Sequence, residues 1–117
     1  MITLTVNGTA LTAELADNSS AEALKEMLAD GPVTVEMSDY ASMEKVGSLW
    51  KSLPTNNEQI TTEAGDLILY QGDQLVIYYA PNSWDFTRLG KIKDVTASEL
   101  KEILGTGDVE VTLALAE

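Results

Sequence analysis

Cysteine and histidine are both absent from this chain of 117 residues. Without cysteine there is no disulfide framework, no thiolate nucleophile and no cysteine-based metal site. Without histidine the chain lacks the usual acid–base side chain at neutral pH and the commonest transition-metal ligand. Ser-His-Asp and Cys-His catalytic groups are therefore excluded, and we expect neither a cofactor nor a bound metal.

Basic residues are scarce as well. The chain has 7 Lys and Arg residues against 19 Asp and Glu, which gives a formal net charge of −12. This charge repels nucleic acid phosphates and anionic lipid surfaces, so we expect neither as a partner. No stretch approaches the roughly 18 apolar residues of a membrane span. The amino-terminal segment 1–6 is typical of a strand and not of a signal peptide, so we expect a cytoplasmic protein.

The remaining composition is that of a globular protein, with 44% hydrophobic and 22% charged residues. A chain of this length can bury a core without disulfides or metal ions. We therefore expect a single domain over residues 1–117.

The first 15 residues predict a β-hairpin. Ile2, Leu4 and Val6 alternate with polar residues, as in a strand with one buried face. Asn7-Gly8 follows, and both residues tolerate the positive φ angles of a tight hairpin turn. Apolar and polar residues alternate again over residues 11–15, which predicts the returning strand.

A helix–strand unit occurs twice. Ser19 to Glu22 and Thr96 to Glu99 both have the capping-box pattern that begins a helix. The segments that follow, LKEMLADGPVTVEM and LKEILGTGDVEVTL, share identical Leu, Lys, Glu, Leu, Gly and Val positions. We interpret them as one supersecondary unit used twice, each helix covering an opening of a sheet. The alternative is independent convergence on a common helix–glycine–strand pattern.

The segment between the two units is different. Residues 40–54 are predicted to be irregular, because Gly47, Ser48 and Pro54 interrupt any period. Residues 65–70 and 75–79 predict two strands, the second apolar throughout and covered on both faces. Residues 80–85 predict a loop, and 86–92 a further strand. Seven or eight strands with two helices favour a mainly β fold, a closed or nearly closed antiparallel barrel.

The aromatic residues and the single arginine indicate where a site could lie. All seven aromatic residues fall between positions 40 and 86, and Arg88 follows them directly. Arginine can bind a carbonyl or carboxylate through its planar fork while aromatic rings supply apolar walls. The candidate ligand-binding residues are Arg88, Trp84, Phe86, Tyr40, Glu44 and Trp50. The alternative is that the aromatic side chains fill the core and Arg88 pairs with one of the 19 acids.

Five short motifs occur in order in the middle of the chain: Ser38-Asp39-Tyr40, Glu44-Lys45, Leu53-Pro54, Glu63-Ala64-Gly65-Asp66-Leu67 and Thr87-Arg88-Leu89-Gly90-Lys91-Ile92. In this order and spacing they resemble the bacterial cyclophilin-like domain family, and the resemblance covers nearly the whole chain. Members of that family stand alone or lie beside flavodoxin-type domains. The resemblance implies an eight-stranded barrel closed by a helix at each end, and it implies no established reaction.

True cyclophilins isomerise X–Pro bonds, which requires an apolar pocket and a donor near the prolyl nitrogen but no nucleophile. They carry a Phe-His-Arg run that this chain lacks, since Phe86 is followed by Thr87 and Arg88. The leading hypothesis is therefore a non-catalytic module that binds a small molecule or peptide. The alternatives are a peptidyl-prolyl isomerase and a structural or homodimerisation module, and the chain is expected to be a monomer or homodimer.

Overall fold

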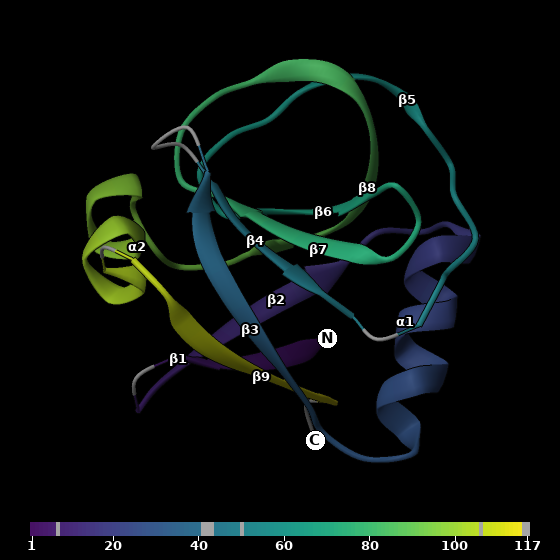
Figure 1. Cartoon of the computed structure of the whole chain (residues 1–117), viewed down its shortest axis with the longest axis horizontal. Helices are drawn as coiled ribbons and strands as arrows, with labels where there is room; N and C mark the ends of the chain where they lie inside the picture. The colour runs from purple at the N-terminus through teal and green to yellow at the C-terminus, as the bar shows by residue number, and fades with distance from the viewer. Residues whose placement is uncertain (7, 41–43, 50, 106, 116–117) are drawn as a thin grey trace.

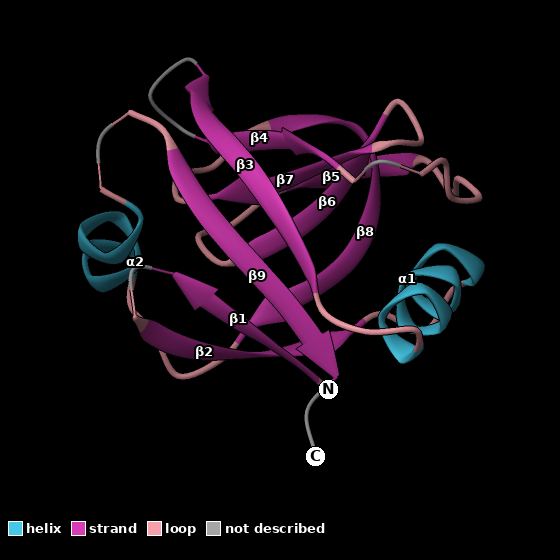
Figure 2. Ribbon diagram, turned by 60° about the horizontal axis from the view of Figure 1, so that its bottom comes forward, coloured by secondary structure: helices cyan, strands magenta, loops and turns pink. Residues whose placement is uncertain are grey.

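The computed structural model describes residues 1–6, 8–40, 44–49, 51–105 and 107–115, without the side chains of residues 40, 44 and 84. Within these residues the chain forms nine strands and two helices (Figures 1 and 2). In chain order they are β1 (Ile2–Val6), β2 (Thr9–Leu15), α1 (Ser19–Ala29), β3 (Val33–Tyr40), β4 (Glu44–Ser48), β5 (Glu58–Thr61), β6 (Asp66–Tyr70), β7 (Gln74–Tyr78), β8 (Ser83–Ile92), α2 (Ala97–Leu104) and β9 (Val109–Leu115).

Eight of these strands form a closed antiparallel barrel. The strand order is β2-β1-β9-β3-β4-β7-β6-β8, and β2 pairs with β8 to complete the ring. The ninth strand, β5, lies outside the ring and pairs with the first half of β8. This confirms the predicted mainly β, closed antiparallel barrel with two helices.

The predicted hairpin is β1–β2, in which Val6 pairs with Thr9, and Asn7 of the predicted turn lies outside the described residues. The two repeated strands, β3 and β9, lie side by side and antiparallel, with Val35 opposite Val111. Because these two strands run in opposite directions, the helices that precede them lie on opposite sides of the molecule (Figure 2).

The main core fills the interior of the barrel. Inward-facing residues of the strands, such as Leu4, Leu67 and Val111, are fully buried there. Both helices contribute leucines to the same core, among them Leu24 and Leu100. The interior is therefore filled with side chains.

A second, smaller core lies on the outer face of the barrel. Ile68, Val76, Tyr78 and Phe86 form it, and Ile60 of β5 packs against them. The middle of β6 and β7 is consequently buried on both faces, as the apolar run of β7 predicted.

The prediction of an irregular segment over residues 40–54 is wrong in part, since β4 lies between β3 and β7. Gly47 suggested a break in the chain, but its role is steric. A Cβ at Gly47 would lie 2.4 Å from the carbonyl oxygen of Glu36, so only glycine allows β4 to cross β3 this closely. The predicted loop at 80–85 is also too long, because β8 begins at Ser83 and pairs there with β5.

The two helices begin differently. At α2 the predicted capping box is present, with Thr96 as N-cap and Glu99 bonded back to it. At α1 the N-cap is Asn18, one residue before the predicted Ser19. The Asn18 side chain accepts a hydrogen bond from the Ala21 N–H and donates one to the Arg88 carbonyl, both at 2.8 Å. Asn18 thereby fixes the start of α1 against β8.

Candidate functional site

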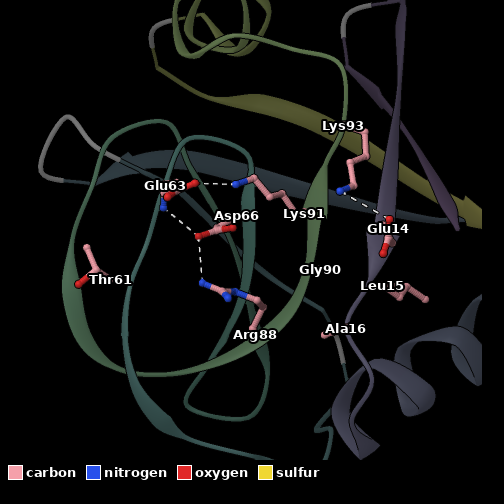
Figure 3. Close-up of a pocket in the computed structure, with 10 residues that line it drawn as sticks. All are labelled: Glu14, Leu15, Ala16, Thr61, Glu63, Asp66, Arg88, Gly90, Lys91 and Lys93. Atoms are coloured by element: carbon pink, nitrogen blue, oxygen red, sulfur yellow. Dashed lines mark hydrogen bonds and ion pairs between the residues drawn. The ribbon is translucent and has the colours of Figure 1, made fainter.

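A polar hollow of about 280 Å³ lies where the end of β8 pairs with both β6 and β2 (Figure 3). Its lining residues come from β2 and β8 with the residues that follow each, and from the end of β5 through the start of β6: Glu14, Leu15, Ala16, Thr61, Glu63, Asp66, Arg88, Gly90, Lys91 and Lys93. Six of these ten are charged, three of each sign. We call this hollow the Arg88 pocket.

Arg88 has its side chain 38% exposed, and one guanidinium nitrogen lies 3.3 Å from Asp66 Oδ2. A guanidinium carries five N–H donors, so this single long contact leaves most of its hydrogen-bonding capacity for other acceptors. The Nε–H is buried and has no acceptor among the residues that the structure describes. A buried donor without a partner is unusual and often marks a functional position.

Asp66 is the fixed end of this ion pair. It is only 2% exposed and its Oδ2 also accepts a hydrogen bond of 2.8 Å from the main-chain N–H of Glu63. Gly65, at φ +95°, makes the turn that brings these residues together and hydrogen-bonds to Tyr78 and Ile92. Asp66 is therefore held by the backbone and orients the guanidinium of Arg88.

Two further ion pairs border the pocket, and both are more exposed. Lys91 Nζ lies 2.7 Å from Glu63 Oε2, and Lys93 Nζ lies 3.5 Å from Glu14 Oε2. The hydrogen bond from Lys91 lowers the pKa of Glu63, and the positive charges of Lys91 and Arg88 add to this effect. Glu63 is therefore ionised at neutral pH. Exposed pairs of this kind contribute little to stability, so their members can exchange partners readily.

The structure places the predicted site residues in different surroundings. Arg88 lines the pocket, whereas Phe86 is 4% exposed and packs in the outer core against Tyr78, with ring centroids 5.6 Å apart. Phe86 thus fills a core, while Arg88 pairs with Asp66 and also lines the pocket. Trp84 lies on β8 opposite Ile60.

The other three predicted residues are described less fully. Tyr40 and Glu44 pair with each other across β3 and β4, away from the Arg88 pocket along the sheet. Trp50 lies outside the described residues. The side chains that surround Arg88 are therefore mainly charged, and none of the residues found to line the pocket is aromatic.

A second polar cluster, which the sequence reasoning did not find, joins the β3–β4 hairpin to the segment before β9. Lys45 is fully buried, and its Nζ lies 2.7 Å from Asp39 Oδ1 and donates to the Gly107 carbonyl. Asp39 also accepts hydrogen bonds from the Gly107 N–H and the Tyr79 hydroxyl. The hydrogen bond from Lys45, followed by that from Gly107, lowers the pKa of Asp39 below its ordinary value of 3.8. These bonds are directed within the protein, so the cluster fits a structural role.

The family follows from comparison with known proteins. A model described as the cyclophilin-like family matches residues 4–114, almost the whole chain. The chain belongs to the cyclophilin-like family. The resemblance carried by the middle motifs is thus confirmed. Five of the residues in those motifs line the pocket: Glu63, Asp66, Arg88, Gly90 and Lys91.

This cyclophilin-like domain is also similar in structure to part of a larger protein. The solved "Structure of McbB in complex with tryptophan" matches with a TM-score of 0.72 at 17% sequence identity. The match covers 98% of this chain but 44% of the McbB chain, so the domain spans less than half the length of that protein. At this identity the likeness shows the fold alone. No curated protein sequence matches the domain significantly.

The described part of the domain lacks two other kinds of functional feature. Neither of its helices is long and apolar enough to cross a membrane. Its acidic residues form no group of three or more arranged to hold a metal ion.

Proposed function

We propose that this domain is a non-catalytic binding module for a small polar molecule or peptide end, with Arg88 as the anchor for a carboxylate. The observation that carries the proposal is the arginine itself. Its guanidinium is oriented by a buried aspartate, is partly open to the pocket, and uses one long contact. Preorganised arginine of this kind suits planar carboxylate groups.

The size and lining of the pocket support a small ligand. Its volume of about 280 Å³ is at the lower end of the roughly 300–1,000 Å³ of typical ligand pockets. We also infer that the two helices close the ends of the barrel, which has a filled interior. A ligand would then bind on the outside, where β2, β6 and β8 meet. The complex of McbB with tryptophan, on the same fold, is compatible with a small-molecule ligand.

An NMR titration of the ¹⁵N-labelled domain tests the proposal, with acetate and tryptophan as probes. We expect saturable shifts at the amides of residues 14–16 and 88–91. Arg88→Lys keeps a positive charge beside Asp66 but loses the fork, so it should weaken binding about tenfold or more, as for a lost charged hydrogen bond. Lys101→Ala, at an exposed position of α2, is the control and should bind as the unmodified domain does. Unchanged affinity in Arg88→Lys would refute the proposal.

Peptidyl-prolyl isomerase activity receives less support. Isomerisation needs an apolar pocket for the proline ring beside the donor. The residues that line the Arg88 pocket are mostly charged, and Phe86 is packed into the outer core. A protease-coupled assay on Xaa-Pro peptides at micromolar protein should therefore show no acceleration.

The homodimer prediction has one structural candidate, the outer edge of β5. This strand ends the sheet order and pairs only with β8 among the described strands. Three of its four residues are exposed, so a second copy could add a strand there. Light scattering tests this idea, and a monomer at high micromolar concentration would exclude it.

A further inference from the structure

We infer that the Arg88 pocket takes a zwitterion, a small molecule carrying a carboxylate and an ammonium on neighbouring atoms, as an α-amino acid does. The inference rests on the proposed function and specifies its ligand. It derives from the balance of charge in the pocket, the contacts that Asp66 makes with Arg88 and Glu63, and the net charge of the whole chain.

The pocket is an exception to the charge of the protein. The chain carries a formal net charge of −12, with only seven basic residues. Three of the seven, Arg88, Lys91 and Lys93, line this pocket, where they are matched by three carboxylates. The local formal charge is therefore zero, while both signs of charge are presented to the same space (Figure 3).

The two groups best placed for a zwitterion lie on either side of Asp66. Arg88 donates to Asp66 Oδ2 at 3.3 Å, and the Glu63 N–H donates to the same oxygen at 2.8 Å. The buried Asp66 carboxylate thus contacts both the Arg88 guanidinium and the main chain of Glu63. The side-chain carboxylate of Glu63 is itself 72% exposed. A ligand carboxylate on Arg88 would bring an adjacent ammonium toward Glu63.

Glu63 is free to accept that ammonium at a small cost. Its present partner is Lys91, which is 42% exposed, so the pair can open into solvent. The carboxylate remains ionised at neutral pH because Lys91 and Arg88 lower its pKa. The ammonium of the ligand would take the place of Lys91 beside Glu63. Since the ligand as a whole is neutral, the charge balance of the pocket would stay intact.

Ligands with a single charge fit less well. A simple anion would meet Arg88 but would offer nothing to Glu63 and would be opposed by the negative field of the whole chain. A simple cation would have to compete with lysines that the pocket already holds. A zwitterion has no net charge, so the long-range field does not oppose it, and it satisfies both kinds of group.

Three matched probes test the inference: alanine, propionate, which lacks the ammonium, and ethylamine, which lacks the carboxylate. Small ligands bind weakly, so NMR titration at pH 7 is suited to the measurement. We expect alanine to bind at least about tenfold more tightly than either probe with one charge, the gain of one charged contact. Added salt should strengthen propionate binding by screening the repulsion, and should affect alanine little.

Two variants separate the two ends of the ligand. Arg88→Lys should weaken both alanine and propionate. Glu63→Gln should weaken the binding of alanine about tenfold and leave the affinity for propionate unchanged or slightly higher. Glu58→Gln, an exposed carboxylate on β5 outside the pocket lining, is the control and should change neither.

The outcomes distinguish the inference from the function on which it rests. Equal affinity for alanine and propionate, or alanine binding that is insensitive to Glu63→Gln, overturns the zwitterion inference. If propionate binding still depends on Arg88, the carboxylate-binding function stands. If neither probe gives binding that depends on Arg88, both fail.

Discussion

The buried ion pair between Lys45 and Asp39 gives a prediction in which two substitutions break the same contact with unequal effect. Lys45 is 0% exposed, whereas the Asp39 side chain is 31% exposed. Asp39→Asn leaves the ammonium of Lys45 buried with only neutral acceptors. Lys45→Met leaves a carboxylate that still accepts from Gly107 and Tyr79 and still reaches water. We therefore expect Asp39→Asn to be much the more destabilising change.

The magnitudes follow from the burial of the group left behind. Removing one partner from a buried pair typically costs about 3–5 kcal/mol, because a buried charge remains without compensation. That figure applies to Asp39→Asn, where the charge left behind is fully buried. Methionine has a length similar to that of lysine, and Gly107 is an exposed residue whose carbonyl we expect to reach water, so Lys45→Met should cost about 1 kcal/mol or less. The difference between the variants should be about 2 kcal/mol or more.

Urea unfolding, followed by far-UV circular dichroism, measures both free energies of unfolding. The pKa of Asp39 is lowered in the folded state, so its contribution is fully present above the unfolded pKa and is lost as pH falls through the folded pKa. The difference in free energy of unfolding between Asp39→Asn and the unmodified domain should therefore be smaller at pH 3 than at pH 7. The reasoning would be refuted if Lys45→Met lost more stability than Asp39→Asn at pH 7. It would also be refuted if the stability lost in Asp39→Asn did not change with pH.

Two further predictions concern the surroundings of the Arg88 pocket. A Cβ at Gly90 would lie 2.4 Å from the Glu14 carbonyl oxygen, so Gly90→Ala must move β8 away from β2. This change should lower the free energy of unfolding by about 1–3 kcal/mol, measured by a thermal melt. Unchanged stability would contradict the close packing. Asn18→Ala should lower the free energy of unfolding in urea by about 1–2 kcal/mol. We expect this loss to exceed that of Thr96→Ala, because Asn18 combines its helix cap with a hydrogen bond to the Arg88 carbonyl. Equal losses of stability in the two variants would show that the hydrogen bond from Asn18 to Arg88 contributes nothing.

The parts of the fold that the sequence predicted are those set by local patterns. The β1–β2 hairpin, the capping box at Thr96 and the apolar run of β7 each depend on neighbours in the chain. The repeated unit was recognised from its sequence, but the pairing of its two strands, β3 and β9, was not predicted. Their identical valines, Val35 and Val111, lie opposite each other. This long-range pairing is a finding of the structure.

The parts that were wrong depend on distant contacts. Gly47 resembles a chain break in the sequence and is a strand residue in the barrel, because its missing side chain makes room for β3. Strand β5 has only one partly buried residue, Ile60, and gives no clear alternation. It is defined by pairing with β8 and by covering the outer core.

The location of the Arg88 pocket illustrates why local alternation is not enough to find a site. Simple alternation along β8 would place Lys91 on the same face as Leu89, inside the barrel. The register shifts there, however: Arg88 pairs with Ile68 and Gly90 with Leu67, so Leu89 has no partner on β6. Such a bulge changes the side on which the following residues lie. Leu89 and Ile92 both face the main core as a result, while Arg88 and Lys91, three positions apart, share the outer pocket beside Asp66, the residue paired with Lys91. Because one extra residue produces this arrangement, deleting the bulge should remove the pocket while leaving the barrel closed.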